Sequence, residues 1–327
     1  MKAAIIEGLG QVPVCRNIPD PEPAGDLEVA RVRAAAIKNI ERMLAAGAHY
    51  ANARLPLPAQ LGMDAVVSLA GGRRAYAGAT PLGGAMAEQM LVDPATVVTV
   101  PDAVGDASAA ALPNAGVSAW LALEYTGQLR PGQSVLILGA TSVTGGLAVQ
   151  LATHKFAAGH VVAVGRDQPR LDALTRQGAD QVVGIADGLD QLGPAIAAVH
   201  AKRPFDLVLD FLWGRPAEQV LRALGGDDLA ATYHRTRYVQ VCETAGPEVT
   251  LPAAVLRSAG IEILGQGGGS VPPEAFARVS TEIIPELFAM LARGTLTVDI
   301  VTRPLDEVAE AWIEDVPSGT RAVLIPQ

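Results

Sequence analysis

The sequence predicts an α/β protein in which a doubly wound parallel sheet is accompanied by a second, β-rich domain. The apolar segment at residues 135–138 is continuous and leads directly into a turn of small residues. Further strand-like segments alternate with helical stretches from about residue 121 to 265, whereas short alternating segments fill residues 1 to about 120. Strands covered on both faces are apolar throughout and half-buried strands alternate, so the chain contains two kinds of sheet.

The first 120 residues predict strands of an irregular barrel. They are rich in Pro and Gly, and residues 30–34, 65–69 and 96–100 are short β-prone segments of the alternating kind. Turn residues that separate short strands at close intervals are typical of antiparallel β domains.

The middle of the chain predicts six parallel strands, and the tail returns to mixed character. The predicted strands are residues 135–138, 161–165, 181–184, 205–210, 237–241 and 261–264. The tail predicts a helix at 273–292, a strand at 298–301, a short helix at 308–313 and a last strand at 322–325. Because no helix follows this last strand, we expect it to rejoin the first domain.

A small-residue turn joins the first of the six strands to a helix, and its geometry favours phosphate binding. The start of such a helix presents unpaired N–H groups and the positive end of the helix dipole to an anion. The usual fingerprint has a middle glycine that admits the phosphates, and Ser142 stands at that position here. Its hydroxyl either donates to a phosphate oxygen or crowds the site. The candidate residues of this turn are Gly139, Ala140, Thr141, Ser142, Val143, Thr144 and Gly145.

The second strand ends in a positive charge, which predicts NADPH as the cofactor. An NAD enzyme places Asp or Glu there, whereas this chain has Gly165 followed by Arg166. An arginine pairs with the 2′-phosphate of NADP, a contact worth roughly 1.5–3 kcal/mol. Arg170, one helical turn further on, is a second candidate contact. Asp167 keeps NAD open as an alternative, and both arginines can instead be solvated surface charges.

Composition excludes several classes of protein. The chain has 327 residues, which suggests two domains, and a net charge of -9, which argues against nucleic acid and acidic membrane surfaces as partners. No apolar run reaches about 18 residues, so no membrane span is expected. The start has one Lys and a short apolar run, which does not resemble a signal peptide, so we expect a cytoplasmic protein.

The cysteines argue against a metal centre. Cys15 and Cys242 are isolated, and neither a CxxC pair nor a His at suitable spacing completes a tetrahedral site. Each thiol is more typical of a small packed hydrophobe than of a reactive group. No metal site is therefore predicted.

Segments along the whole chain resemble the zinc-independent quinone oxidoreductases of the medium-chain dehydrogenase/reductase superfamily. The resemblance implies a GroES-like catalytic domain formed by residues 1–120 and completed by 266–327. It also implies a Rossmann domain at 121–265, NADPH as hydride donor and a homodimer. The segments that carry it are residues 1–4, 83–88, 115–120, 139–141 with Gly145, 148–150, 178–180, and Leu256 with Arg257 ahead of Gly265.

The resemblance bears on metal chemistry as well. Zinc-dependent relatives carry a ligand His after a Gly near residue 62, where this chain has Gly62, Met63 and Asp64. Without zinc, the substrate carbonyl must be polarised by hydrogen-bond donors or be electrophilic already. Quinones and conjugated enones are therefore the expected substrates.

Two residues are the catalytic candidates that the resemblance implies. Aligning Glu41 with the acidic residue of the relatives places Lys38 where they carry Asn, whereas a shift by one places Asn39 there. Tyr50 aligns with a tyrosine that faces the substrate pocket, so it is the preferred proton donor. The alternative for Tyr50 is a ring packed at the seam between the domains.

The remaining candidates are expected around the nicotinamide. Ser118 aligns with a Thr that lies near this ring in the relatives. Phe211 and Cys242 end the fourth and fifth predicted strands, and ligands bind at the carboxyl edge of such sheets. Gly265, Gln266 and Gly267 follow the sixth strand and either border the ring or form a surface linker.

Two classes of function follow from these residues. The first is an NADPH-dependent oxidoreductase that reduces quinones or α,β-unsaturated carbonyls by hydride transfer. The second is a non-catalytic NADPH-binding sensor or scaffold protein, which the departures from pattern at Ser142 and Lys38 support. The sequence leaves the physiological substrate open.

Overall fold

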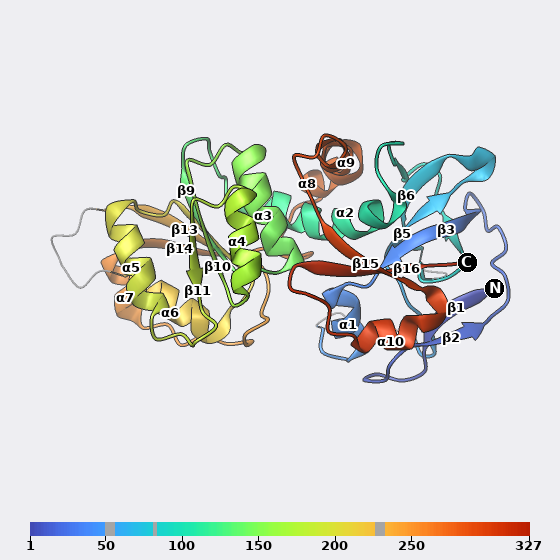
Figure 1. Ribbon diagram of the computed structural model, residues 1–327, viewed down its shortest axis with the longest axis horizontal. Coiled ribbons are helices and arrows are strands. Elements are labelled where there is room, and N and C mark those ends of the chain that lie inside the picture. The colour runs from blue at the N-terminus through green and yellow to red at the C-terminus, as the bar shows by residue number, and fades with distance from the viewer. Residues whose placement is uncertain (50–55, 81–83, 226–232) are drawn as a thin grey trace. The chain divides into compact units, whose positions relative to one another are not determined.

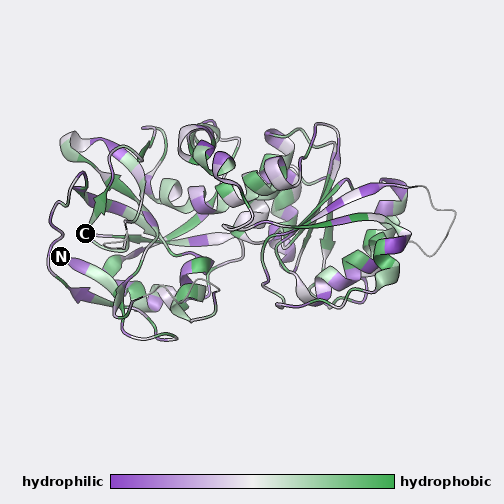
Figure 2. Ribbon diagram, turned by 180° about the vertical axis from the view of Figure 1, so that it is seen from behind, coloured by the Kyte–Doolittle hydropathy of each residue, from purple (hydrophilic) through white to green (hydrophobic). Residues whose placement is uncertain are grey.

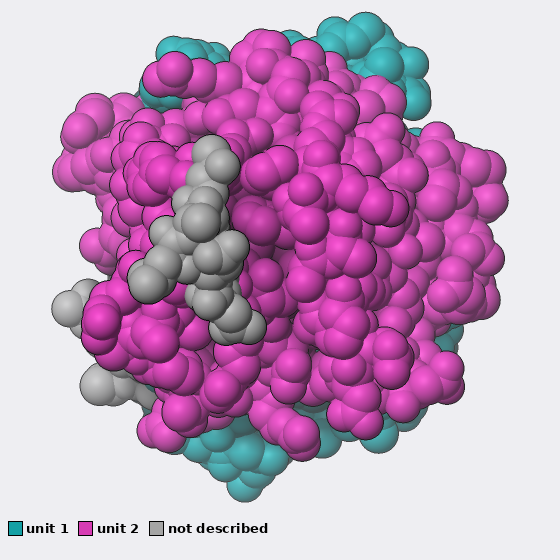
Figure 3. All heavy atoms as spheres, turned by 90° about the vertical axis from the view of Figure 1, so that its left-hand side faces the viewer, with its two compact units in different colours: residues 1–114, 278–327 teal, residues 115–277 magenta. Residues whose placement is uncertain are grey.

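The computed structural model describes residues 1–49, 56–80, 84–225 and 233–327. They form two compact units, one of residues 1–114 with 278–327 and one of residues 115–277, coloured separately in Figure 3. The strand pattern of the sequence placed boundaries at 120 and 265. Each boundary between the units falls inside a helix, α2 (Asp106–Leu121) or α8 (Pro273–Arg278), which strand patterns do not locate.

Unit 2 is built on one sheet of six parallel strands. Their order is β11-β10-β9-β12-β13-β14 (Figure 1), which is the 3-2-1-4-5-6 order of the doubly wound fold. The prediction of a doubly wound sheet is confirmed. The strands are β9 (Ser134–Leu138), β10 (His160–Gly165), β11 (Gln181–Gly184), β12 (Leu207–Asp210), β13 (Arg235–Gln240) and β14 (Gly260–Gly265).

Helices cover this sheet because the apolar strands must be buried on both faces. All residues of β9 and β12 are buried, and the core around them includes Leu136, Val162, Val208 and Tyr238. Green and purple alternate along the covering helices in Figure 2, as expected for helices with one apolar side. These helices are α3 (Val143–His154), α4 (Gln168–Arg176), α5 (Leu192–Lys202), α6 (Gly214–Leu224) and α7 (Ala253–Ser258).

Unit 1 contains a three-stranded sheet, β2-β1-β4, and a seven-stranded sheet. The larger sheet runs β15-β16-β3-β5-β6-β8, with β7 also paired to β3. The strands are β1 (Lys2–Ile6), β2 (Val14–Asn17), β3 (Glu28–Ala36), β4 (Ala59–Gln60), β5 (Asp64–Ser68), β6 (Arg74–Gly78), β7 (Gln89–Val92), β8 (Val98–Thr99), β15 (Asp299–Pro304) and β16 (Thr320–Ile325).

The last strand rejoins the first part of the chain, as the sequence predicts. Strand β16 pairs antiparallel with β3, with Val323 opposite Ala36 and Leu324 opposite Ala35. The C-terminal segment therefore completes the β-rich unit. Its helix α10 (Val308–Ile313) has the predicted bounds.

Two helical features differ from the prediction. Helix α2 was not anticipated, because its Ala-rich sequence with Pro113 inside carries little periodicity. The expected helix at 273–292 is divided into α8, a π-helical turn at Val279–Ile283 and α9 (Ile284–Ala292). Pro285 is the second residue after the π turn, and because proline has no N–H to donate, the regular hydrogen-bond ladder is interrupted there. The remaining helix of unit 1 is α1 (Asn39–Ala45).

No helix within the described ranges combines the length and apolarity needed to cross a membrane.

Candidate nucleotide-binding and active site

The predicted cofactor segments of unit 2 gather at the carboxyl edge of its parallel sheet. The turn after β9 is tied to β10, because the N–H groups of Gly139 and Ala140 both donate to Val164 O, at 3.0 and 2.9 Å. Cys242 N donates to Asp210 O at 3.3 Å, and Gln266 N donates to Gln240 O at 2.8 Å. Topology thus collects segments that are far apart in the sequence.

The turn after β9 is held tight by glycines at both ends. Gly139 has a φ of +79°, which L side chains rarely adopt. A β-carbon at Gly145 would lie 2.3 Å from Gly139 O, so helix α3 approaches the turn too closely for any side chain there. This close approach directs the start of α3 at the carboxyl edge of the sheet.

Ser142 is the N-cap of α3, a role that differs from both alternatives the sequence left open. Its Oγ accepts a hydrogen bond from Gly145 N at 3.0 Å and donates to Gly139 O at 2.8 Å. Both functions of the hydroxyl are therefore used inside the turn. Among the described residues, the N–H groups of Val143 and Thr144 have no hydrogen-bond partner, so they are the donors that this helix offers to an anion.

After β10, the side chain of Arg166 is exposed, whereas the carboxylate of Asp167 is hydrogen-bonded to the backbone. Arg166 is exposed, and its guanidinium makes no hydrogen bond or ion pair with the described part of the chain. The Asp167 carboxylate caps α4 by accepting from Arg170 N at 2.8 Å. A β-carbon at Gly146 would come within 2.9 Å of Arg170 Nη2, so this guanidinium lies against the first turn of α3. Two cationic groups thus flank the turn.

The structure reveals a buried carboxylate at this edge that sequence reasoning missed. Asp210 ends β12 and is fully buried. Its Oδ1 accepts from Leu212 N and Trp213 N at 2.8 and 2.9 Å, and its Oδ2 accepts from the Tyr238 hydroxyl at 2.7 Å. Burial raises the pKa of Asp210, and the three hydrogen bonds oppose that rise. The signal that could have revealed Asp210 is an acidic residue at the end of an otherwise apolar strand.

This carboxylate fixes the loop that carries Phe211. Trp213 has a φ of +55°, in the left-handed region that is costly for a residue of its size. The two N–H bonds to Asp210 hold that conformation. Leu212, in the same loop, would touch any β-carbon at Gly139, at 3.0 Å. The loop therefore lies beside the turn after β9.

The other predicted residues of unit 2 range from buried to exposed. Burial first, then the charges of Asp210 and Glu243, raise the pKa of the Cys242 thiol to about 11. Gln266 is buried and its side-chain oxygen accepts from the hydroxyl of Thr126, whereas Gly265 and Gly267 on either side are exposed. Ser118 lies on α2 and is half-buried.

In unit 1, Lys38 is the centre of a buried ion cluster. Lys38 is 2% exposed, and its Nζ lies 3.1 Å from Glu41 Oε1, 2.9 Å from Asp64 Oδ1 and 3.2 Å from Ala36 O. Burial alone lowers the pKa of Lys38, but Asp64 and Glu41 outweigh it and the net pKa is raised. The contacts with Glu41 and Ala36 are hydrogen bonds and the contact with Asp64 is an ion pair, so the ammonium is engaged by three partners.

Glu41 connects this cluster to the segment where zinc-dependent relatives carry a His. Its Oε2 accepts from Lys38 N at 2.8 Å, and its Oε1 accepts from Met63 N at 2.9 Å. Asp64 also raises the pKa of the buried Tyr76 hydroxyl, after burial itself. Lys38 thus stabilises the start of α1 and the backbone at Met63.

Tyr50, the preferred proton donor, lies outside the described residues. Within the described ranges, no three or more His, Cys, Asp or Glu side chains are grouped so that they could hold a metal ion.

Comparisons with known proteins agree with this architecture. No family model matches the chain. A protein of Emericella nidulans named probable NADPH-dependent quinone reductase is 29% identical over an alignment that covers 96% of each chain. The quinone oxidoreductase of Pseudomonas syringae pv. Tomato DC3000 shares the fold with a TM-score of 0.81 at 23% identity, over 99% of each chain.

A second solved structure, Escherichia coli quinone oxidoreductase complexed with NADPH, gives a TM-score of 0.82 at 19% identity and covers 100% of each chain. At these identities the solved structures establish the fold, and the Emericella relative adds sequence similarity along nearly the whole chain. The chain therefore has the fold of these quinone oxidoreductases and is similar in sequence, along 96% of its length, to the Emericella protein.

Proposed function

We propose that this protein is an NADPH-dependent oxidoreductase that reduces quinones or α,β-unsaturated carbonyls without zinc. The observation that carries the proposal is the exposed, unpartnered guanidinium of Arg166 at the end of β10, among the described residues. The name of the Emericella relative and the NADPH bound to the Escherichia coli enzyme support the same cofactor.

The residues at the carboxyl edge fit this nucleotide. The N–H groups of Val143 and Thr144 would bind the pyrophosphate at the start of α3. Arg166 and Arg170 would pair with the 2′-phosphate. The Asp167 carboxylate is engaged as a helix cap, so it is not presented to ribose hydroxyls as an NAD enzyme requires. When bound, NADPH supplies the hydride.

The nicotinamide end of the site is proposed to lie along Ser118, Phe211, Cys242 and residues 265–267. The exposed glycines beside the buried Gln266 allow the backbone to approach a flat ring closely. Phe211 is buried, and the Cys242 thiol stays neutral because its pKa is about 11. These residues would exclude water without adding charge near the ring.

Zinc independence is supported by the residues at the corresponding position in unit 1. Met63 replaces the ligand His of zinc-dependent relatives, and the ammonium of Lys38 is already paired with both Glu41 and Asp64. With no Lewis acid to polarise a carbonyl, the substrate must be electrophilic already, which favours quinones and enones.

The proton donor is proposed to be Tyr50, and the ion cluster changes the role proposed for Lys38. Because the Lys38 ammonium is engaged by two hydrogen bonds and an ion pair, we assign it to holding the Met63 segment rather than to donating a proton. Tyr50→Phe should lower kcat while the KM for NADPH stays unchanged. An unchanged kcat would assign the proton to water or to another side chain.

The test of the proposed function is NADPH oxidation followed at 340 nm. Wild-type protein is assayed with NADPH and with NADH, using 9,10-phenanthrenequinone and a 2-alkenal, against enzyme-free controls. Arg166→Ala should raise the KM for NADPH on the order of tenfold to a hundredfold and leave the KM for NADH unchanged. Arg176→Ala is the matched control, because Arg176 is an exposed arginine at the far end of α4, the helix that follows Arg166.

Each outcome of this assay has a definite meaning. Equal KM values for both cofactors in wild type would contradict the role of Arg166. Binding of NADPH without turnover of either acceptor would favour the sensor or scaffold. The better acceptor decides between quinone and enone.

A homodimer is proposed from the resemblance. It is checked by light scattering on the protein as it elutes from a size-exclusion column.

A further inference from the structure

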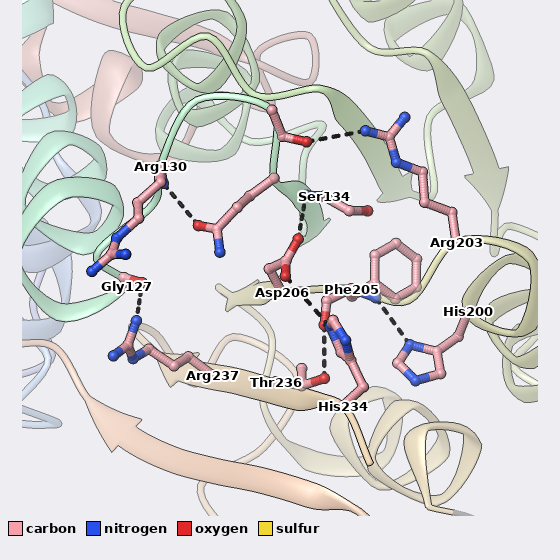
Figure 4. A network of polar contacts seen from close by, with 12 residues as sticks. Gly127, Arg130, Ser134, His200, Arg203, Phe205, Asp206, His234, Thr236 and Arg237 are labelled. Carbon is pink, nitrogen blue, oxygen red and sulfur yellow. Dashed lines mark hydrogen bonds and ion pairs between the residues drawn. The ribbon is translucent and has the colours of Figure 1, made fainter. Parts of the chain in front are cut away.

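Unit 2 has a polar cavity at the end of the sheet opposite the nucleotide-binding turn. It lies where β9, β12 and β13 begin, and its volume is about 290 Å³. Figure 4 shows the polar contacts around it. Its charged and aromatic lining consists of Arg130, Asp206, Tyr233, His234, Arg235 and Arg237. Because these residues lie before the strands or in their first residues, the proposed cofactor site at the carboxyl ends does not include them.

The positive charge of this cavity exceeds the carboxylates available to it. Arg235 donates to both oxygens of Glu262, at 2.7 and 2.9 Å, and Arg237 Nε lies 3.6 Å from the same carboxylate. One carboxylate therefore serves two guanidinium groups. The guanidinium of Arg130 makes no hydrogen bond or ion pair with any residue the structure describes.

The one acidic residue of the lining is already engaged. Asp206 Oδ2 accepts from Ser134 N at 2.8 Å, and its Oδ1 lies 3.5 Å from His234 Nε2. His234 Nε2 is also 3.1 Å from Phe205 O. Asp206 thus anchors the start of β9 rather than neutralising the arginines.

The geometry of two arginines defines where an anion would bind. Arg237 Nη1 donates to Gly127 O at 3.5 Å, and the side chains of Arg130 and Arg237 both reach the neighbourhood of Gly127 in Figure 4. Like charges directed at one place repel unless an anion lies between them. In a chain of net charge -9, such a concentration of arginines is a local exception.

An aromatic side chain accompanies the cationic groups. Tyr233 is 75% exposed, although its ring is large and mostly apolar. An exposed aromatic ring beside guanidinium groups provides a stacking surface for a planar ligand. The cavity therefore combines an anion-binding end with a flat apolar face.

We propose that this cavity binds a phosphate monoester of a planar ring, of the size of a nucleoside monophosphate. The phosphate is held between Arg130 and Arg237, as charge-assisted hydrogen bonds from arginine favour. The ring packs on Tyr233. This second ligand site is independent of the proposed catalytic reaction.

The test is a calorimetric titration of the whole protein with adenosine 5′-monophosphate in phosphate-free buffer of low ionic strength. Saturating NADP+ is present so that the carboxyl edge of the sheet is filled. Saturable binding with a Kd of about 1 mM or tighter is expected. Arg130→Ala should weaken it at least tenfold, whereas Arg222→Ala, an exposed arginine on α6, should leave it unchanged.

Further arms identify which part of the ligand is bound and protect against a folding defect. Adenosine without phosphate should give no saturable heat, and Tyr233→Ala should weaken the monophosphate more than inorganic phosphate. If Arg237→Ala does not fold, Arg237→Lys takes its place in the titration, because lysine retains a cation at this position. The proposal is overturned if no saturable binding occurs or if Arg130→Ala binds as wild type does. Two results would assign the binding of the monophosphate to the cofactor site and also overturn the proposal. One is the loss of this binding in Arg166→Ala, and the other is binding that occurs without NADP+ and is lost when NADP+ is added.

Discussion

The side chain of Thr141 covers the backbone of Gly165, so that a β-carbon at Gly165 would lie 2.3 Å from Thr141 Cγ2 and 2.8 Å from its Oγ1. Thr141 belongs to the turn after β9, and Gly165 ends β10 immediately before Arg166. The two parts of the proposed nucleotide site are therefore packed against each other as one body.

This packing predicts that Gly165→Ala impairs NADPH binding. The added methyl group must displace Thr141, and with it the phosphate turn and Arg166, so the KM for NADPH should rise on the order of tenfold. Overpacking of this kind costs about 1–3 kcal/mol of stability. Gly78→Ala is the control in both the assay and thermal unfolding, because a β-carbon there meets nothing within 4 Å. Equal KM values for both variants would refute the coupling.

The capping role of Ser142 predicts that two small substitutions of this residue differ in their effects on stability and on NADPH binding. Ser142→Ala loses the cap, which costs about 1 kcal/mol, whereas Ser142→Gly costs only a few tenths. Because Ser142→Gly also releases Gly145 N and removes the side chain, it should tighten NADPH binding. Thermal unfolding and quenching of protein fluorescence by NADPH measure the two effects. Weaker binding by Ser142→Gly would show instead that the hydroxyl reaches a phosphate.

The Asp210 network predicts a graded loss of stability. Asp210→Ala leaves two N–H groups and a phenol without their acceptor, so unfolding in urea should show a loss of at least about 2 kcal/mol. Asp210→Asn keeps an oxygen for both N–H groups and should lose less. Tyr238→Phe alone should cost about 1–3 kcal/mol, because it leaves a buried carboxylate oxygen unpaired. Equal losses for the Ala and Asn variants would argue against this assignment.

The raised pKa of Cys242 predicts that the stability of the fold depends on pH in alkaline solution. Its folded-state pKa of about 11 lies above the ordinary value of 9.0, so the fold favours the neutral thiol. The unfolded chain releases this proton first, and stability is therefore lost as the pH rises from about 9 towards 11. In a Cys15→Ser background, alkylation of native protein by iodoacetamide should reach its half-maximal rate near pH 11. A half-maximal rate near pH 9 would mean that the thiol is not buried in solution.

The ion pairs of Lys38 in unit 1 predict a second loss of stability at alkaline pH. Its pKa is raised above 10.5, so its ion pairs stabilise the fold fully below pH 10.5 and are lost as the pH rises through the folded-state value. Lys38→Met leaves two carboxylates without their cation and should cost roughly 3–5 kcal/mol at neutral pH. The stability lost by wild type above pH 10.5 should be smaller in this variant, as urea unfolding at several pH values would show. An unchanged alkaline slope would mean that Lys38 is not the group that titrates.

The local features of the site were predictable from the sequence. Short β-prone segments that alternate with helical stretches identified all six parallel strands. The run at β9 is continuously apolar because that strand is buried on both faces. The turn after β9 and the arginine after β10 followed from the spacing of residues within one β-α-β unit. The pairing of the last strand with the first domain followed from the absence of a helix after it.

Tertiary structure decided what depends on contacts between distant residues. The role of Lys38 depends on Asp64, and that of Asp210 on Tyr238, which are paired only once the strands have assembled. The hydroxyl of Ser142 found its partners in the backbone of its own turn, a choice set by the left-handed conformation of Gly139. The sequence by itself determined the layers and the nucleotide-binding edge, because hydrophobic periodicity is local. Only the folded chain determined which polar groups are satisfied and which, like the guanidinium groups of Arg166 and Arg130, have no partner among the described residues, because burial and pairing depend on the whole fold.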